Sequence, residues 1–131
     1  MTTVELLAIL ASIVLGGVVV FQLGLAAGAP LGAAAWGGKH PGVLPGRLRA
    51  GSLVAAVVLA GAAWVVLARA ALVGPGPTST AIRVTTWVFG AVFVLNTLGN
   101  LASKSRLERA IMTPATLVLA TCFLLVALRG P

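Results

Sequence analysis

Few side chains in this sequence are capable of bond-making chemistry. The 131 residues include a single cysteine, Cys122, a single histidine, His40, and only two acidic residues, Glu5 and Glu108. Thiol–disulfide exchange needs a pair of cysteines, and a zinc site needs three or four His, Cys or carboxylate ligands. The four groups are scattered over separate segments of the chain. We therefore expect no metal and no cofactor, and an enzyme is the less favoured class of protein.

His40 is the strongest remaining candidate for acid–base catalysis, because an unperturbed histidine titrates near neutral pH. It stands beside Lys39 in a segment rich in glycine and proline, and no carboxylate is close to it in the sequence to orient the ring. A solvated loop residue is the plainer interpretation.

A second group of polar side chains could bind a ligand without doing chemistry. Asn96 and Asn100 are one helical turn apart and therefore share a helix face, and polar groups within a membrane tend to face the interior of a bundle. The candidate cavity is formed by Gln22, Asn96, Asn100, Thr113 and Thr116. It would suit a lipid headgroup, an ion or a small solute. The alternative is plain interhelical hydrogen bonding, worth about 0.6 kcal/mol per bond, and we favour it.

Composition determines the elements that must position these groups. Hydrophobic residues make up 60% of the chain and charged residues 8%, whereas a soluble domain is typically about 25% charged. Such a chain cannot cover a soluble surface, so we predict an integral membrane protein. The net charge of +7 does not indicate nucleic-acid binding, because the lysines and arginines flank apolar segments.

Four segments are apolar enough to span a bilayer, which takes about 20 residues per helix. We predict one all-α membrane domain, a four-helix bundle, with spans at about 4–27, 48–72, 81–101 and 106–128. Thr2 with Glu5, and Ser105 with Glu108, have the spacing of capping boxes. The first span has no lysine or arginine before it, so we expect it to be retained rather than cleaved as a signal peptide.

The long connection, residues 28–47, allows two interpretations. Residues 30–36 could form a short helix that begins at Pro30 and is stopped by two glycines, with Trp36 as its anchor in the membrane interface. The alternative is an irregular loop of glycine and proline, and the sequence does not separate the two.

The distribution of basic residues predicts the orientation. Six of them flank the first and third connections, namely Lys39, Arg47, Arg49, Lys104, Arg106 and Arg109. Only Arg69, Arg83 and Arg129 lie on the opposite side. The positive-inside rule then places both termini outside and the basic connections in the cytoplasm. We expect the six basic residues to contact anionic lipid, the first partner that we predict.

Repetition and small residues suggest how the helices pack. The two halves of the chain resemble each other weakly, which suggests two helical hairpins related as a parallel repeat. Ala8, Ser12, Gly16, Gly24 and Gly28 share one face of the first span. Small residues allow the close backbone approach that associates helices in lipid. We expect this face to pack within the bundle, although it could also bind a second copy or another membrane protein.

Three segments carry a resemblance to a known group of proteins: residues 28–32 (GAPLG), 36–45 (WGGKHPGVLP) and 100–109 (NLASKSRLER). They resemble a family of small, uncharacterised four-span membrane proteins of high-GC bacteria, and the likeness extends over most of the chain. The resemblance implies the four-span fold and a location in the bacterial inner membrane. It implies no activity.

The leading functional hypothesis is a non-enzymatic binding or scaffold component of the inner membrane that self-associates or joins another membrane protein. It rests on small-residue packing faces combined with a near absence of reactive side chains. The second hypothesis is a small channel or transporter that uses the polar cluster. The third is an enzyme acting on lipid.

Overall fold

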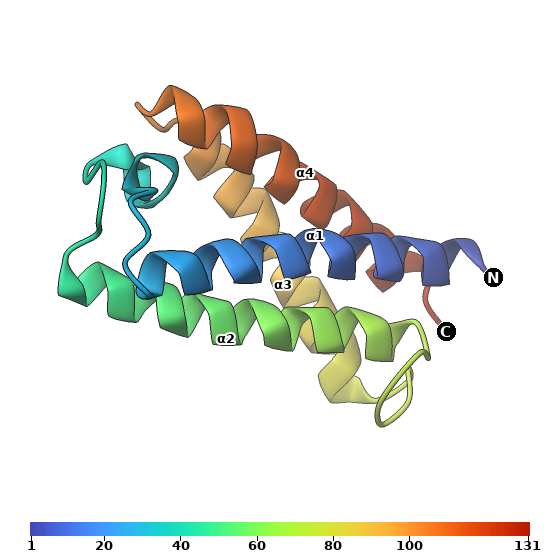
Figure 1. Cartoon of the computed structure of the whole chain (residues 1–131). Helices are drawn as coiled ribbons and strands as arrows, with labels where there is room; N and C mark the ends of the chain where they lie inside the picture. The colour runs from blue at the N-terminus through green and yellow to red at the C-terminus, as the bar shows by residue number, and fades with distance from the viewer.

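The computed structural model describes all of residues 1–131 and contains helices and connections without a strand. Its four long helices are α1 (Thr3–Ala26), α2 (Gly46–Arg69), α3 (Thr80–Leu101) and α4 (Arg106–Arg129) (Figure 1). Each is long and apolar enough to cross a membrane. The predicted all-α four-helix fold is confirmed. The largest shift of a boundary is at the end of α2, which stops at Arg69 rather than near residue 72.

The helices form two antiparallel hairpins, α1 with α2 and α3 with α4. The second hairpin crosses the first obliquely, so that α1 also packs along α4 whereas α2 and α3 touch less extensively (Figure 1). Both termini and the connection 70–79 lie at one end of the molecule, the terminal end (Figure 1). The connections 27–45 and 102–105 lie at the other end, the basic end, with six of the nine lysines and arginines.

The two predicted capping boxes have different outcomes. At the start of α1 both bonds form, from the Glu5 amide to Thr2 Oγ1 at 3.1 Å and from the Thr2 amide to Glu5 Oε2 at 2.8 Å. At the start of α4 the Glu108 amide donates to Ser105 Oγ at 3.3 Å, but the Ser105 amide donates to Ser103 Oγ at 3.2 Å. The second box is therefore wrong in its return bond, and the Glu108 carboxylate is free of the capping role.

The largest buried cluster joins all four helices. Leu15 of α1, Val66 of α2, and Phe93 and Phe123 of α3 and α4 are almost fully buried within it. The rings of Phe93 and Phe123 meet edge to face with their centroids 5.1 Å apart, a favourable arrangement of aromatic quadrupoles. Gly90 allows the close approach of α3 to α4, because a Cβ there would lie 2.8 Å from Leu124 Cδ2.

The predicted small-residue face of α1 is only partly used for packing. Ala8 is buried in the core, but Gly16 is exposed and a Cβ on it would meet nothing within 4 Å. Gly28 lies beyond the helix, with a φ of +101°, and its amide donates to the Leu25 carbonyl. This bond, together with the one from the Ala29 amide to the Gly24 carbonyl, forms a Schellman motif that ends α1. Packing within the bundle is thus wrong for Gly16, whereas Gly28 lies beyond the helix beside Arg49 of α2.

The connection 27–45 is compact but does not form the single short helix that was one of its two interpretations. It contains two 3₁₀ turns, η1 (Gly32–Ala34) and η2 (Trp36–Gly38), separated by Ala35 in an extended conformation. The Gly32 amide donates to the Gly42 carbonyl at 2.8 Å, which folds the segment back on itself. Glycine at residue 32 makes this folding back possible, since a side chain there would overlap the His40 carbonyl.

One arginine organises the terminal end. Arg69 is 4% exposed, and its guanidinium donates to the backbone oxygens of Gly130 at 2.9 Å, of Pro77 at 3.3 Å, and of Pro131. These bonds join the end of α2 to the connection 70–79 and to the end of α4. A buried arginine with several acceptors satisfies the rule that interior charges must be hydrogen-bonded.

Candidate functional site

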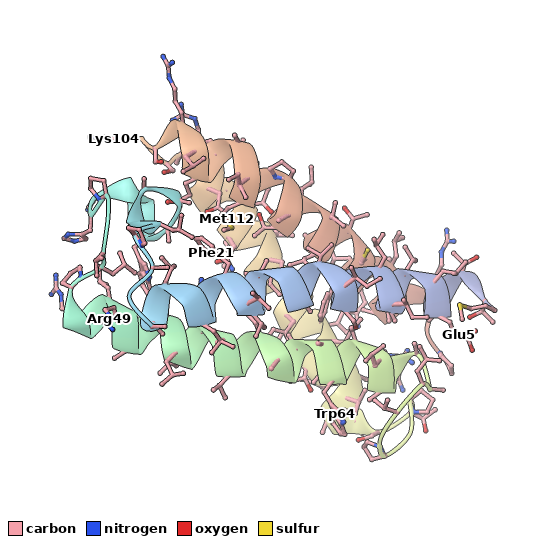
Figure 2. The ribbon with its side chains drawn as sticks, in the orientation of Figure 1. Glu5, Phe21, Arg49, Trp64, Lys104 and Met112 are labelled. Atoms are coloured by element: carbon pink, nitrogen blue, oxygen red, sulfur yellow. The ribbon has the colours of Figure 1, made fainter.

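A cavity of about 390 Å³ lies between the two hairpins, toward the basic end. All four helices and the connection 27–45 contribute to its wall, and 13 of its 18 lining residues are hydrophobic. Phe21 of α1 and Met112 of α4 lie in the space between these helices (Figure 2). The lining residues Val58 of α2 and Val92 of α3 are 49% and 39% exposed. The cavity therefore opens sideways between α2 and α3, which touch less extensively than α1 and α4.

The structure brings together most of the polar residues predicted to form a cavity. Gln22, Asn96, Asn100 and Thr116 all line this one space, from α1, α3 and α4. Thr113 is not part of the lining, although its Oγ1 atom is buried and has no hydrogen-bond partner. The shared face of Asn96 and Asn100 follows from the four-residue spacing.

Part of the polar cluster serves to join α3 to α4. Asn100 Nδ2 donates to Thr116 Oγ1 at 3.3 Å, and Thr97 Oγ1 lies 3.0 Å from the same atom. Interhelical hydrogen bonding, the favoured explanation from the sequence, therefore accounts for Asn100 and Thr116. Thr97 escaped the sequence reasoning, although it stands one residue after Asn96 in an apolar helix. Asn96 itself is exposed at the side of the cavity.

Glu108 is the main site residue that sequence reasoning missed. Its side chain is 7% exposed and lines the cavity, and its Oε2 atom is buried without a hydrogen-bond partner. The Gly37 amide and the Ser103 hydroxyl lie beside the carboxylate. The signal was present in the sequence, because Ser103 stands two residues before Ser105 and competes with Glu108 for the Ser105 amide.

Gln22, from the other hairpin, carries a second unsatisfied acceptor in the wall of the same cavity. Gln22 Oε1 is buried and has no hydrogen-bond partner, and Gln22 belongs to the same lining. Buried polar atoms without a partner are rare in folded proteins and call for an explanation. Two residues of the cavity wall, one from α1 and one from α4, thus each carry a buried oxygen acceptor without a partner.

A wider polar hollow adjoins the cavity at the basic end. It is lined by Lys39 and Lys104 from the two connections, and it shares Asn96, Asn100 and Glu108 with the cavity. Two lysines and one carboxylate therefore surround the polar mouth of a largely apolar chamber.

The six basic residues predicted to contact lipid divide into two groups. Arg49 Nε donates to the Ala26 carbonyl at 3.1 Å, and Arg109 donates to the Ser103 carbonyl. Both therefore satisfy carbonyls just at or beyond the ends of helices, which have no partner within the helix. The exposed members are Lys39, Arg47, Lys104 and Arg106. Only these four present their charge freely to the surroundings.

Trp36, predicted to anchor the connection in the membrane interface, lies against α2. Its Nε1–H donates to Ser52 Oγ at 3.1 Å, and its ring covers Gly51, where an added Cβ would be 3.1 Å from the ring. The ring is 43% exposed and also lines the cavity. Trp36 thus forms part of the wall between the cavity and the basic end.

The two connections of the basic end pack against each other. The Ser105 hydroxyl donates to the Ala33 carbonyl, and Gly38 fits against Ser105 so closely that a Cβ there would overlap it. The three segments that carry the family resemblance (28–32, 36–45 and 100–109) all belong to this region. Comparison with protein-family models, with curated proteins and with solved structures finds no match.

The reactive groups do not assemble into a recognisable catalytic or metal centre. No three of the His, Cys and Glu side chains come together in the structure. Cys122 is buried in the core cluster, and His40 is not part of the cavity wall. What the arrangement can do chemically is to enclose an apolar group and offer hydrogen-bond acceptors and charges at one end.

Proposed function

We propose that this protein is a non-enzymatic lipid-binding component of the bacterial inner membrane, which holds one amphipathic lipid between its hairpins. The observation that supports this most is the cavity itself, about 390 Å³ in volume, mainly apolar, and open sideways between α2 and α3. Its volume falls in the range of sites for small molecules, about 300–1,000 Å³. A lateral opening between membrane helices faces the acyl chains of the bilayer.

The distribution of charge supports a lipid with a phosphate in its headgroup. Lys39, Arg47, Lys104 and Arg106 are exposed at the basic end, beside the polar mouth of the cavity. Each basic residue near a membrane surface contributes about 1 kcal/mol to the attraction of anionic lipid. The apolar chain would then occupy the cavity, and the phosphate would lie near Lys39 and Lys104.

A channel or transporter is the weaker alternative. The polar cluster of Gln22, Asn96 and Asn100 speaks for it, but toward the terminal end the space between the helices is filled by Phe93, Phe123 and the rest of the core cluster. A polar solute would have to displace these packed side chains to cross. Solute flux into proteoliposomes that Asn96→Leu abolishes would favour this alternative over lipid binding.

The proposal also includes association of this protein with a second copy or with another membrane protein. Gly16 and Gly17 lie exposed on α1 with nothing within 4 Å of an added Cβ. Small residues of this kind permit another helix to approach closely. Self-association through α1, or association with another membrane protein, is compatible with an occupied cavity, because the cavity opens between α2 and α3.

Native mass spectrometry of protein extracted in a mild detergent tests the proposal. Ala55 lines the cavity from α2, whereas Ala60 on the same helix is exposed and does not. We expect one retained lipid per chain in the wild type and in Ala60→Phe, and loss of that lipid in Ala55→Phe, because the added ring fills the cavity. Retention of the lipid by a folded Ala55→Phe protein, or its absence from the wild type, would overturn the proposal.

A further inference from the structure

The polar atoms of the cavity wall indicate the chemistry of its ligand, because the two that lack a partner are of the same kind. Glu108 Oε2 and Gln22 Oε1 are both hydrogen-bond acceptors, both are buried, and neither has a partner. Glu108 is more than nine-tenths buried, and it is the only charged residue in the cavity wall. An occupant that satisfies these atoms must supply hydrogen-bond donors, and a positive charge on it would also pair with the Glu108 carboxylate.

The adjoining hollow adds residues of the opposite charge. Lys39 and Lys104 line this hollow, and Glu108 lines both the hollow and the cavity. A purely anionic headgroup would suit the lysines and leave Glu108 Oε2 without a partner. A purely cationic ligand would suit the carboxylate and leave the lysines unused. A headgroup that carries a phosphate and a protonated amine suits both.

We propose that the site selects a phospholipid whose headgroup ends in a primary ammonium, such as an ethanolamine phospholipid. The ammonium donates to Glu108 Oε2 and Gln22 Oε1, the phosphate lies beside Lys39 and Lys104, and one acyl chain enters the apolar cavity. A primary ammonium has three N–H donors, and a charge-assisted bond to a carboxylate is about twice as strong as a neutral one. This inference rests on the proposed lipid-binding function and specifies its ligand.

The exclusion of related headgroups follows from the same contacts. A choline headgroup keeps the positive charge but has no N–H, so both acceptor oxygens would stay without a hydrogen bond. A glycerol headgroup has hydroxyl donors but no positive charge to pair with Glu108. Leaving a buried charged acceptor unpaired is costly, and we expect each exchange to weaken binding about tenfold or more.

The test titrates detergent-solubilised protein with ethanolamine, choline and glycerol phospholipids of identical acyl chains and measures the bound fraction by native mass spectrometry. We expect the wild type to bind the ethanolamine lipid at least about tenfold more tightly than the other two. Glu108→Gln should remove this preference. Glu5→Gln removes the chain's other glutamate, which lies at the terminal end, and should retain the preference.

The outcomes separate this inference from the proposed function. Equal affinity for the three lipids in the wild type overturns the headgroup inference and leaves lipid binding intact. An ethanolamine preference that survives in Glu108→Gln overturns it as well. If no lipid binds, both proposals fail. Should Glu108→Gln not fold, the comparison of ethanolamine with choline lipid on the wild type still decides, and Gln22→Leu, which should reduce the preference, supplies the variant.

Discussion

The two glutamates occupy the same position at the start of a helix and have different roles. Glu5 accepts from the Thr2 amide and completes a capping box. Glu108 stands at the equivalent position of α4, but Ser103 already accepts from the Ser105 amide. The carboxylate is therefore free of the capping role, and Ser103, five residues upstream, decides between a cap and a site.

The fit of the two connections depends on a glycine that tolerates no side chain. Gly38 has a φ of +71°, and an added Cβ would overlap Ser105. Gly42 has a φ of +89°, but a Cβ there would meet nothing within 4 Å. We predict that Gly42→Ala lowers the free energy of unfolding by about 1 kcal/mol, the cost of a left-handed backbone. Gly38→Ala should cost at least about 1 kcal/mol more, because the overlap adds to it.

Denaturant titration in mixed micelles measures this difference. Equal destabilisation by the two alanines would show that Gly38 is needed only for its backbone conformation and that Ser105 can move away.

The hydrogen bonds between α3 and α4 also have a matched test. Thr116 Oγ1 contacts Thr97 and Asn100 on α3, whereas the exposed Thr121 bonds only to the Leu117 carbonyl of its own helix. We predict that Thr116→Val destabilises the protein by about 1 kcal/mol, since two interhelical bonds at about 0.6 kcal/mol each are lost. Thr121→Val should leave the stability unchanged within about 0.5 kcal/mol. A Thr116→Val protein as stable as Thr121→Val would mean that these contacts contribute nothing.

At the scale of the elements, the connections determine the polar end of the site. Trp36 packs on α2, the Ser105 hydroxyl bonds to the Ala33 carbonyl, and Arg49 bonds to the Ala26 carbonyl at the end of α1. The first two contacts hold the segment 27–45 against α2 and the start of α4, and the third joins α2 to α1. A connection of this length is tolerated because its own side chains and backbone groups pack it, as in other compact loops.

The contact between η2 and α2 yields a prediction on two glycines of one helix. A Cβ at Gly51 would be 3.1 Å from the Trp36 ring, whereas at Gly61 it would meet nothing within 4 Å. Because alanine is favoured over glycine within a helix, we predict that Gly61→Ala stabilises the protein by about 0.5–1 kcal/mol. Gly51→Ala should gain less, because the Trp36 ring must move.

The fluorescence of Trp36 reports this movement when Trp64 and Trp87 are both replaced by phenylalanine. We expect the emission maximum to shift in Gly51→Ala and to stay in place in Gly61→Ala. An unshifted spectrum with full stabilisation in Gly51→Ala would contradict the contact.

At the scale of the whole molecule, the sequence predicted the helices well and their faces poorly. Length and hydropathy alone identify a membrane span, so the four helices and their ends followed from the composition. The buried face did not follow, because helices that are apolar all round carry little signal for the side that packs. Gly16 was assigned to the interior and is exposed.

The candidate site shows the same division between local and distant causes. The shared face of Asn96 and Asn100 follows from helical periodicity, and Gln22 was placed at the correct end of its span. The freedom of Glu108 required a competing bond from Ser103 and the arrival of Gly37 from a connection far away in sequence. The Ser103 bond is local and could have been anticipated from the sequence, whereas the contact with Gly37 is tertiary and a single sequence does not reveal it.

The distribution of basic residues predicts the orientation of the whole bundle in the membrane. The basic end carries six lysines and arginines and the terminal end three, and of those three Arg69 is buried in hydrogen bonds to backbone oxygens. Because positive residues stay in the cytoplasm, we predict that the basic end is cytoplasmic. Val43 in connection 27–45 and Thr78 in connection 70–79 are both exposed and uncharged, so cysteines there leave the charge balance unchanged.

Each cysteine is introduced into a Cys122→Ala background, and spheroplasts are treated with a membrane-impermeant maleimide before or after lysis. Thr78→Cys should be labelled in intact spheroplasts, and Val43→Cys only after lysis. Labelling of Val43→Cys in intact spheroplasts would reverse the orientation, and labelling of both would show that the charge difference is too small to fix one. A reversed bundle would also put Glu108 and the lysines of the polar hollow on the outer leaflet, and the lipid would then have to enter from that side.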